Sequence, residues 1–252
     1  MPITCAQLKE KLEKKEDVFL LDARTPEEYK SWSIKGSVNI PMQSIQNNTG
    51  LIPKEKEIIT ICAHGQRSQY VAAFLKSKGF NVDSVQGGMA SWNAVYDFVP
   101  LVEGSVKVFH VKRVGKGCLG YFVVSGGQAT VIDPSTHTGE YVNFAKNLGC
   151  EIKAIIDTHQ HADHLSGSRL LQDSTGAALF LNQLDRYSFQ GYKDLMENKT
   201  IAFAETEIKA IHTPGHTKGS TSFLVGDEII LTGDTLFIDG VARPDLADKA
   251  GD

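Results

Sequence analysis

Short apolar runs alternate with helical patterns over roughly the first hundred residues of this 252-residue chain. Each run is four residues long, which is typical of a strand buried on both faces. The intervening segments place apolar residues three and four positions apart, as at Val71, Phe74 and Leu75, or open with proline and acids that suit a first helical turn. Strands that alternate with helices predict a parallel sheet flanked by helices. The expected strands are 18–21, 58–61 and 82–85, and the expected helices begin at Pro26 and span 67–78.

The pattern changes after a segment in which Pro100 and Gly104 interrupt it. Strand patterns dominate the next thirty residues, and two helical patterns then lie on either side of a further apolar run. We therefore expect residues 1–98 and 105–252 to form two domains, joined by a linker at 99–104. The expected strands are 106–111, 119–124, 129–132 and 152–156, and the expected helices are 139–148 and 165–173.

Composition excludes several classes of partner. Charged residues make up 22% of the chain, apolar residues 41%, and the net charge is −4, so no polyanion-binding surface is indicated. No apolar run is long enough to span a membrane, and the N-terminus lacks the pattern of a signal peptide. The four cysteines are far apart, which favours a reducing cytoplasm over a disulfide framework. We expect a small-molecule substrate, no nucleic acid and no membrane.

Candidate metal ligands lie at the ends of three probable strands. Four of them fall within six positions directly after the apolar run 152–156, and two more end later β-rich runs. Neutral imidazole and carboxylate groups suit zinc, iron or manganese, and the absence of a nearby cysteine argues against a Cys-type structural zinc site. The six residues are His159, His161, Asp163, His164, His216 and Asp234.

A second chemical site is expected where the strand 58–61 ends at Cys62. A glycine-containing loop leads from this cysteine to a helix near Arg67, so backbone N–H groups would surround the sulfur. Such a cradle, with Arg67 beside it, stabilises a thiolate or a bound anion. His64 within the loop would act either as a proton donor or as a loop-shaping residue. The expected sulfur-binding loop comprises Ala63, His64, Gly65, Gln66 and Ser68.

The segments around Cys62 are similar to the rhodanese family over about residues 3–97. The similarity rests on the runs at 21–29, 34–41 and 87–92. It implies that Cys62 accepts a sulfane sulfur from thiosulfate, a polysulfide or a persulfide and becomes a persulfide itself. We expect Asp22 and Arg24, in the first of these runs, to be structural rather than catalytic.

From residue 105 onward the ligand pattern resembles the metallo-β-lactamase superfamily, and within it the persulfide dioxygenases. Residues 213–217, 232–237 and 242–246 carry that second resemblance, although Ala242 stands where these dioxygenases usually have glycine. It implies an αββα sandwich of α+β class, which follows the α/β rhodanese domain in the sequence. It also implies one iron(II) per chain, held by His159, His216 and Asp234, and Arg243 is a candidate for substrate binding. Because the chain ends soon after Asp234, we expect this domain to be C-terminally incomplete.

Together the two resemblances imply sulfur metabolism. Sulfur transfer through Cys62 would be coupled to oxidation of a low-molecular-weight persulfide by O2 to sulfite, with His161, Asp163 and His164 orienting the ligands or forming a second metal site. One alternative is a thioester hydrolase of glyoxalase II type with two zinc ions. His159, His161 and His216 would then hold one zinc, Asp163 and His164 the other, and Asp234 would bridge them. Another alternative is a sulfur carrier whose metal domain is inactive.

Overall fold

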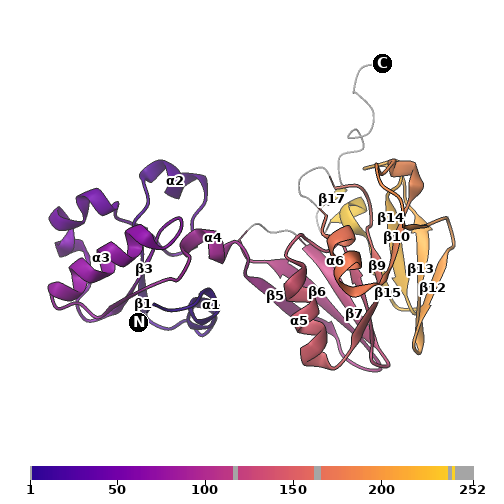
Figure 1. The fold of residues 1–252 in the computed structure, drawn as a ribbon, viewed down its shortest axis with the longest axis horizontal. Coiled ribbons are helices and arrows are strands. Elements are labelled where there is room, and N and C mark those ends of the chain that lie inside the picture. Colours follow the sequence, from indigo (N-terminus) through magenta and orange to yellow (C-terminus); the bar gives the residue numbers. More distant parts are fainter. Residues whose placement is uncertain (1, 116–118, 162–165, 238–239, 242–252) are drawn as a thin grey trace, which may run out of the picture. The chain divides into compact units, whose positions relative to one another are not determined.

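The chain folds into two compact units in a computed structural model, which describes residues 2–115, 119–161, 166–237 and 240–241 (Figure 1). Unit 1 consists of the residues up to Val95, together with a short segment that begins at Arg113. Unit 2 consists of the rest. In the described part of the chain, no helix is both long and apolar enough to cross a membrane.

Unit 1 is built on a parallel sheet with the strand order β2-β1-β3-β4. Side chains alternate across this sheet, because Ile58 joins a core cluster with α3 whereas Ile59 joins one with α1 and α4. Helices therefore cover both faces, as the alternating pattern predicted. The strands are β1 Val18–Asp22, β2 Val38–Asn39, β3 Glu57–Ile61 and β4 Val82–Ser84, and the helices are α1 Cys5–Glu13, α2 Pro26–Ser31, α3 Gln66–Ser77 and α4 Gly88–Trp92, with the 3-10 turns η1 Met42–Asn47 and η2 Thr49–Leu51.

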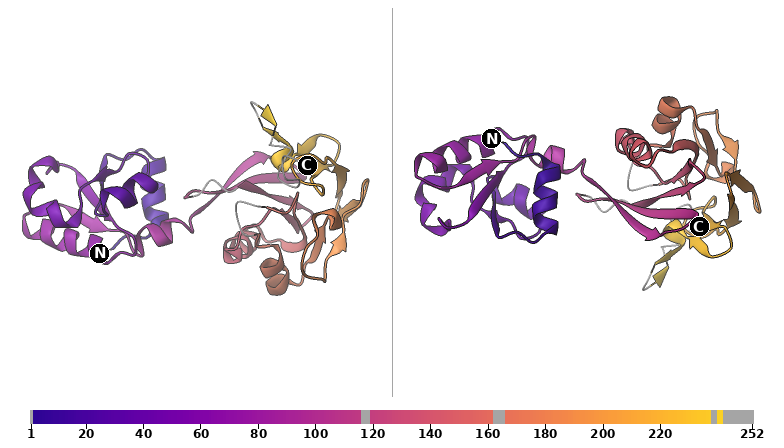
Figure 2. Two further views of the ribbon diagram at one scale, coloured as in Figure 1. Left: turned by 90° about the horizontal axis from the view of Figure 1, so that it is seen from above. Right: turned by 90° about the horizontal axis from the view of Figure 1, so that it is seen from below.

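Unit 2 is a sandwich of two sheets with helices on one outer face (Figure 2). A core cluster that includes Val123, Phe180 and Phe223 fills the space between the seven-stranded sheet, β11-β10-β9-β8-β7-β6-β5, and the four-stranded sheet, β12-β13-β14-β15. A second cluster joins the other face of the large sheet to Tyr141 of α5 and Leu171 of α6. These layers agree with the expected fold class, of which the described residues form the two sheets and one helical layer.

The elements of unit 2 follow the predicted order. The α-helices are α5 Thr138–Leu148 and α6 Ser168–Thr175, and the 3-10 turns are η3 Gln183–Asp185 and η4 Gly233–Thr235. The strands are β5 Tyr96–Val102, β6 Val106–Arg113, β7 Leu119–Ser125, β8 Gln128–Ile132, β9 Glu151–Ile156, β10 Ala178–Leu181, β11 Lys193–Asp194, β12 Thr200–Phe203, β13 Thr206–His212, β14 Thr221–Val225, β15 Ile229–Leu231, β16 Leu236–Phe237 and β17 Gly240–Val241.

The structure differs from the sequence interpretation at the linker predicted for 99–104. Residues 99–102 complete β5, and the chain first passes from unit 1 to unit 2 between Val95 and Tyr96. Pro100 is compatible with this strand because β5 lies at the edge of its sheet, where one row of N–H groups has no partner strand.

Candidate functional sites

Cys62 lies where β3 ends and the chain turns toward α3, and its side chain is only 1% exposed. The backbone N–H of Gly65 donates to its sulfur at 3.1 Å. The carbonyl of Cys62 accepts from the N–H of Met89 at 2.7 Å, so this bond fixes the loop backbone to α4. Gly88 is required at this contact, because a Cβ there would lie 2.1 Å from the Cys62 carbonyl oxygen and its φ is +60°.

The surroundings of Cys62 lower the pKa of its thiol. Burial acts in the opposite direction, but the Ser68 hydroxyl and the backbone N–H groups of Ser68, His64 and Gly65 outweigh it by stabilising the thiolate. Cys5, which is also buried, lacks such donors, and burial raises its pKa to about 11. The structure thus places Cys62 where hydrogen-bond donors favour its thiolate form.

The other residues of the predicted loop lie around Cys62 in different ways. Ser68 is fully buried in the first turn of α3, and its single hydroxyl hydrogen donates to the Gly65 carbonyl at 2.9 Å when it does not donate to the Cys62 thiolate. Ala63 is half-buried, whereas His64 and Gln66 are exposed. The structure thus brings the predicted sulfur-binding residues together at the end of β3.

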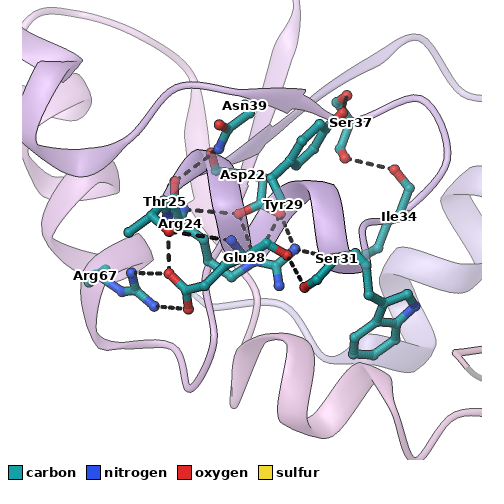
Figure 3. A network of polar contacts seen from close by, with 11 residues as sticks. Asp22, Arg24, Thr25, Glu28, Tyr29, Ser31, Ile34, Ser37, Asn39 and Arg67 are labelled. Carbon is teal, nitrogen blue, oxygen red and sulfur yellow. Dashed lines mark hydrogen bonds and ion pairs between the residues drawn. The ribbon is translucent and has the colours of Figure 1, made fainter.

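Arg67 takes part in an ion pair that its sequence position did not reveal. Its guanidinium donates to both carboxylate oxygens of Glu28 in α2, each at 2.7 Å (Figure 3). The Arg67 contact is the main cause that lowers the pKa of Glu28 to about 2. Arg67 therefore lies beside the cysteine loop, and the two parallel N–H groups of its guanidinium already donate to Glu28.

Three of the predicted metal ligands converge in unit 2. His159 follows β9, His216 follows β13 and Asp234 lies in η4 after β15. One donor atom from each lies within 4.8 Å of the others. The Nε2 atoms of His159 and His216 are 3.9 Å and 3.6 Å from Oδ2 of Asp234.

The chemistry of this group fits a divalent metal. Burial lowers the pKa of His159 to about 4, which keeps its imidazole in the neutral form that binds metals. Its Nδ1 lies 2.9 Å from the Thr158 hydroxyl, and this contact leaves Nε2 facing the cluster. Two imidazoles and one carboxylate form the donor set of non-heme iron(II) sites and of some zinc sites.

His161 belongs to a second group, with Asp133 and Asp157. Its Nε2 is 3.1 Å from Oδ1 of Asp133. Burial opposes protonation of His161, but Asp133 outweighs it and raises the pKa of this histidine to about 9. His161 nevertheless lies close to the first group, because the centroid of its ring is 4.2 Å from that of His159. Asp163, His164 and Arg243 lie outside the described residues.

Asp185 is a part of this site that sequence reasoning missed. Its carboxylate accepts from the N–H of Gln160 at 2.8 Å and from the N–H of Gly219 at 2.6 Å. It also accepts from the Thr217 hydroxyl at 3.0 Å. It therefore joins the loop of His159 to the loop of His216. Asp133 and Asp157 carried a usable signal, because each directly follows a strand, whereas nothing in the spacing around Asp185 indicated its role.

Comparisons with known proteins agree with both halves of this description. A rhodanese-like domain matches residues 4–95, and the metallo-beta-lactamase superfamily matches residues 114–252. "Putative sulfurtransferase YtwF" of Bacillus subtilis is 39% identical over 90 residues, 36% of this chain and 87% of that protein. A hydroxyacylglutathione hydrolase of Synechococcus sp. is 36% identical over 120 residues, 46% of each chain.

A solved structure matches unit 2. The crystal structure of a metallo-beta-lactamase from Staphylococcus aureus subsp. aureus COL has a TM-score of 0.54 and 26% identity, with 59% of this chain and 47% of that chain covered. The chain spans about half the length of the hydroxyacylglutathione hydrolases that it matches.

Proposed function

The chain belongs to the metallo-beta-lactamase superfamily and carries a rhodanese-like domain ahead of it, and from this premise we propose that it is an enzyme of sulfur metabolism that oxidises a persulfide. In this proposal Cys62 accepts sulfane sulfur, and a low-molecular-weight thiol persulfide is oxidised to sulfite in unit 2. The balanced reaction is RSSH + O2 + H2O → RSH + SO3²⁻ + 2 H⁺, in which four electrons pass from sulfur to O2.

The convergence of donor atoms from His159, His216 and Asp234 within 4.8 Å of one another carries the proposal. Two histidines and one carboxylate are the ligands of mononuclear iron(II) oxygenase sites. Iron held by these three residues would supply a centre at which a persulfide and O2 bind side by side. The Thr158 hydroxyl fixes the ring of His159, and Asp185 holds the two histidine loops together, so the protein contributes a rigid donor set.

Thioester hydrolysis is the second candidate function, and the curated relatives favour it. Relatives that match unit 2 include hydroxyacylglutathione hydrolases at 31% to 36% identity. Hydrolysis with two zinc ions would need His161 as a ligand of the first ion together with His159 and His216. In the structure Nε2 of His161 contacts Asp133, although its ring lies 4.2 Å from that of His159.

Metal content and substrate assays separate these functions. We expect anaerobically purified protein to contain about one iron per chain and to consume O2 when glutathione persulfide is added, with release of sulfite. Asp234→Ala serves as the control that lacks a ligand, and S-lactoylglutathione tests hydrolysis. Two zinc ions per chain, with thioester hydrolysis and no persulfide-dependent O2 uptake, would establish the second candidate. Sulfur transfer through Cys62 without O2 uptake or thioester hydrolysis would indicate that the protein is a sulfur carrier.

A further inference from the structure

Two ion pairs lie on one side of the Cys62 loop. Arg24 and Asp22 form the first, with Nη2 and Oδ2 2.6 Å apart, and their side chains are 5% and 0% exposed. Arg67 and Glu28 form the second. Figure 3 shows that both pairs belong to one polar network at the end of β1 and the start of α2. The two cations and the two anions leave this network without net charge.

Arg67 is the cation in the first turn of α3, directly after the Cys62 loop. The negative charge of the Cys62 thiolate contributes to the raised pKa of Arg67, after the larger effect of Glu28. Each terminal nitrogen of the guanidinium directs one N–H at Glu28, however, so the forked donor pair that could hold a dianion is already occupied. Because the pKa of Glu28 is lowered to about 2, this pair stays ionised at any working pH.

We propose that Glu28 determines the donor preference of the Cys62 loop, because its ion pair with Arg67 masks the charge that a dianionic sulfur donor would need. The loop then favours an organic persulfide over thiosulfate. This inference rests on the proposed role of Cys62 in sulfur transfer and specifies the substrate class of that site. Glu28 acts through Arg67 and is therefore a specificity-determining residue rather than a catalytic one.

The two donors deliver the same sulfur with different charge. With a persulfide, RSSH + Cys62–S⁻ → Cys62–SSH + RS⁻, and the thiolate leaves with the electron pair of the broken S–S bond. With thiosulfate, S2O3²⁻ + Cys62–S⁻ → Cys62–SS⁻ + SO3²⁻, and sulfite leaves. Thiosulfate thus brings two negative charges to a loop whose donors are neutral N–H groups, apart from the masked Arg67.

The test compares Glu28→Gln with Glu27→Gln in the full chain. Glutamine at position 28 can maintain the capping box that Glu28 forms with Thr25, so the helix start is preserved while the charge is lost. Glu27 lies next to it on an exposed face and serves as a matched control for net charge. Donors are thiosulfate and the persulfide of 2-mercaptoethanol, whose organic group is uncharged. The readout is the ratio of the two kcat/KM values for persulfide formation on Cys62.

We expect Glu28→Gln to raise the thiosulfate-to-persulfide ratio about tenfold, which corresponds to about 1.4 kcal/mol, and to do so mainly through a lower KM for thiosulfate. The gain should shrink at high ionic strength. Glu27→Gln should leave the ratio unchanged. In an Arg67→Gln background, Glu28→Gln should give no gain, because there is no charge left to unmask.

An unchanged ratio in Glu28→Gln, in a protein that still transfers sulfur, would overturn this inference alone. An equal gain with and without Arg67 would overturn it as well, since Glu28 would then repel thiosulfate directly. If the wild-type protein transfers sulfur from neither donor, it is the proposed function that fails. Thermal midpoints of all variants show whether each one is folded.

Discussion

The thiol of Cys62 should react as a thiolate at a lower pH than the other described cysteines. Hydrogen-bond donors lower its pKa, whereas burial raises that of Cys5 to about 11 and also raises that of Cys150. We expect iodoacetamide to label the Cys62 peptide with a midpoint below the ordinary thiol value of about 8.5. Ser68→Ala should move this midpoint upward. Peptide mass spectrometry over a pH series measures both, and the midpoint does not depend on how accessible the sulfur is. A midpoint unchanged in Ser68→Ala would contradict this account.

The metal ligands should divide into two classes when they are replaced. His159→Ala, His216→Ala or Asp234→Ala each remove a donor of the converging group, and we expect each to abolish iron loading. His161→Gln should retain most of the iron, because His161 contacts Asp133. Elemental analysis after anaerobic reconstitution measures the difference. Equal loss of metal in all four variants would instead favour a site that includes His161.

These residues could be found from the sequence because each ends a strand. Cys62, His159 and Asp234 follow apolar runs whose length identifies them as strands. Their strands β3, β9 and β15 belong to three different sheets, so the packing of the two sheets of unit 2, and not a shared sheet edge, brings His159 and Asp234 together. Glu28 was visible only as a helix-start residue, and its partner Arg67 lies 39 positions away. No local pattern encodes such a pairing, because the fold alone brings α2 beside α3.

We expect Asp185 to stabilise the loops that carry His159 and His216, because its carboxylate accepts hydrogen bonds from both. Asp185→Asn would direct an amide N–H2 toward backbone donors, so one buried N–H group would lose its acceptor. The expected cost is about 1–3 kcal/mol of stability. We also expect metal affinity to fall by about 10- to 100-fold, since the loops of His159 and His216 would lose their common anchor. Competition with a chelator measures the affinity.

Asp173→Asn is a suitable control for this experiment. Asp173 is exposed on α6, and its replacement changes the net charge equally. If both variants bind metal as tightly as the wild type, the loops keep their position without Asp185.

Elements were predicted well where apolar runs were long and buried, and less well at the sheet edge. β3 and β9 differ by one residue from the expected strands because most of their positions are buried and apolar. β5 was mistaken for part of a linker, since Pro100 breaks its pattern and its residues are mostly half-buried or exposed. An edge strand needs neither a continuous apolar run nor all of its N–H groups, so its sequence resembles a loop.

At the scale of the whole molecule, each unit has its own apolar core. Among the described residues, two buried apolar clusters lie in unit 1 and two in unit 2, and the two pairs of clusters share no residue. The two fold classes were predictable because the periodicity changes near residue 100. The position of the boundary was not, because the first strand of unit 2 directly follows Val95.

Separate cores predict that the two units unfold in separate thermal transitions. Gly88→Ala should lower only the transition of unit 1, because the new Cβ would meet the Cys62 carbonyl oxygen at 2.1 Å and the φ of +60° is strained for alanine. Removal of iron should lower only the transition of unit 2. A metal whose free concentration is one hundred times its Kd contributes about 2.7 kcal/mol to the stability of the folded state. Differential scanning calorimetry of the metal-loaded chain, with and without chelator, measures both shifts in one protein. A single transition that moves with both changes would show that the two cores unfold as one cooperative structure.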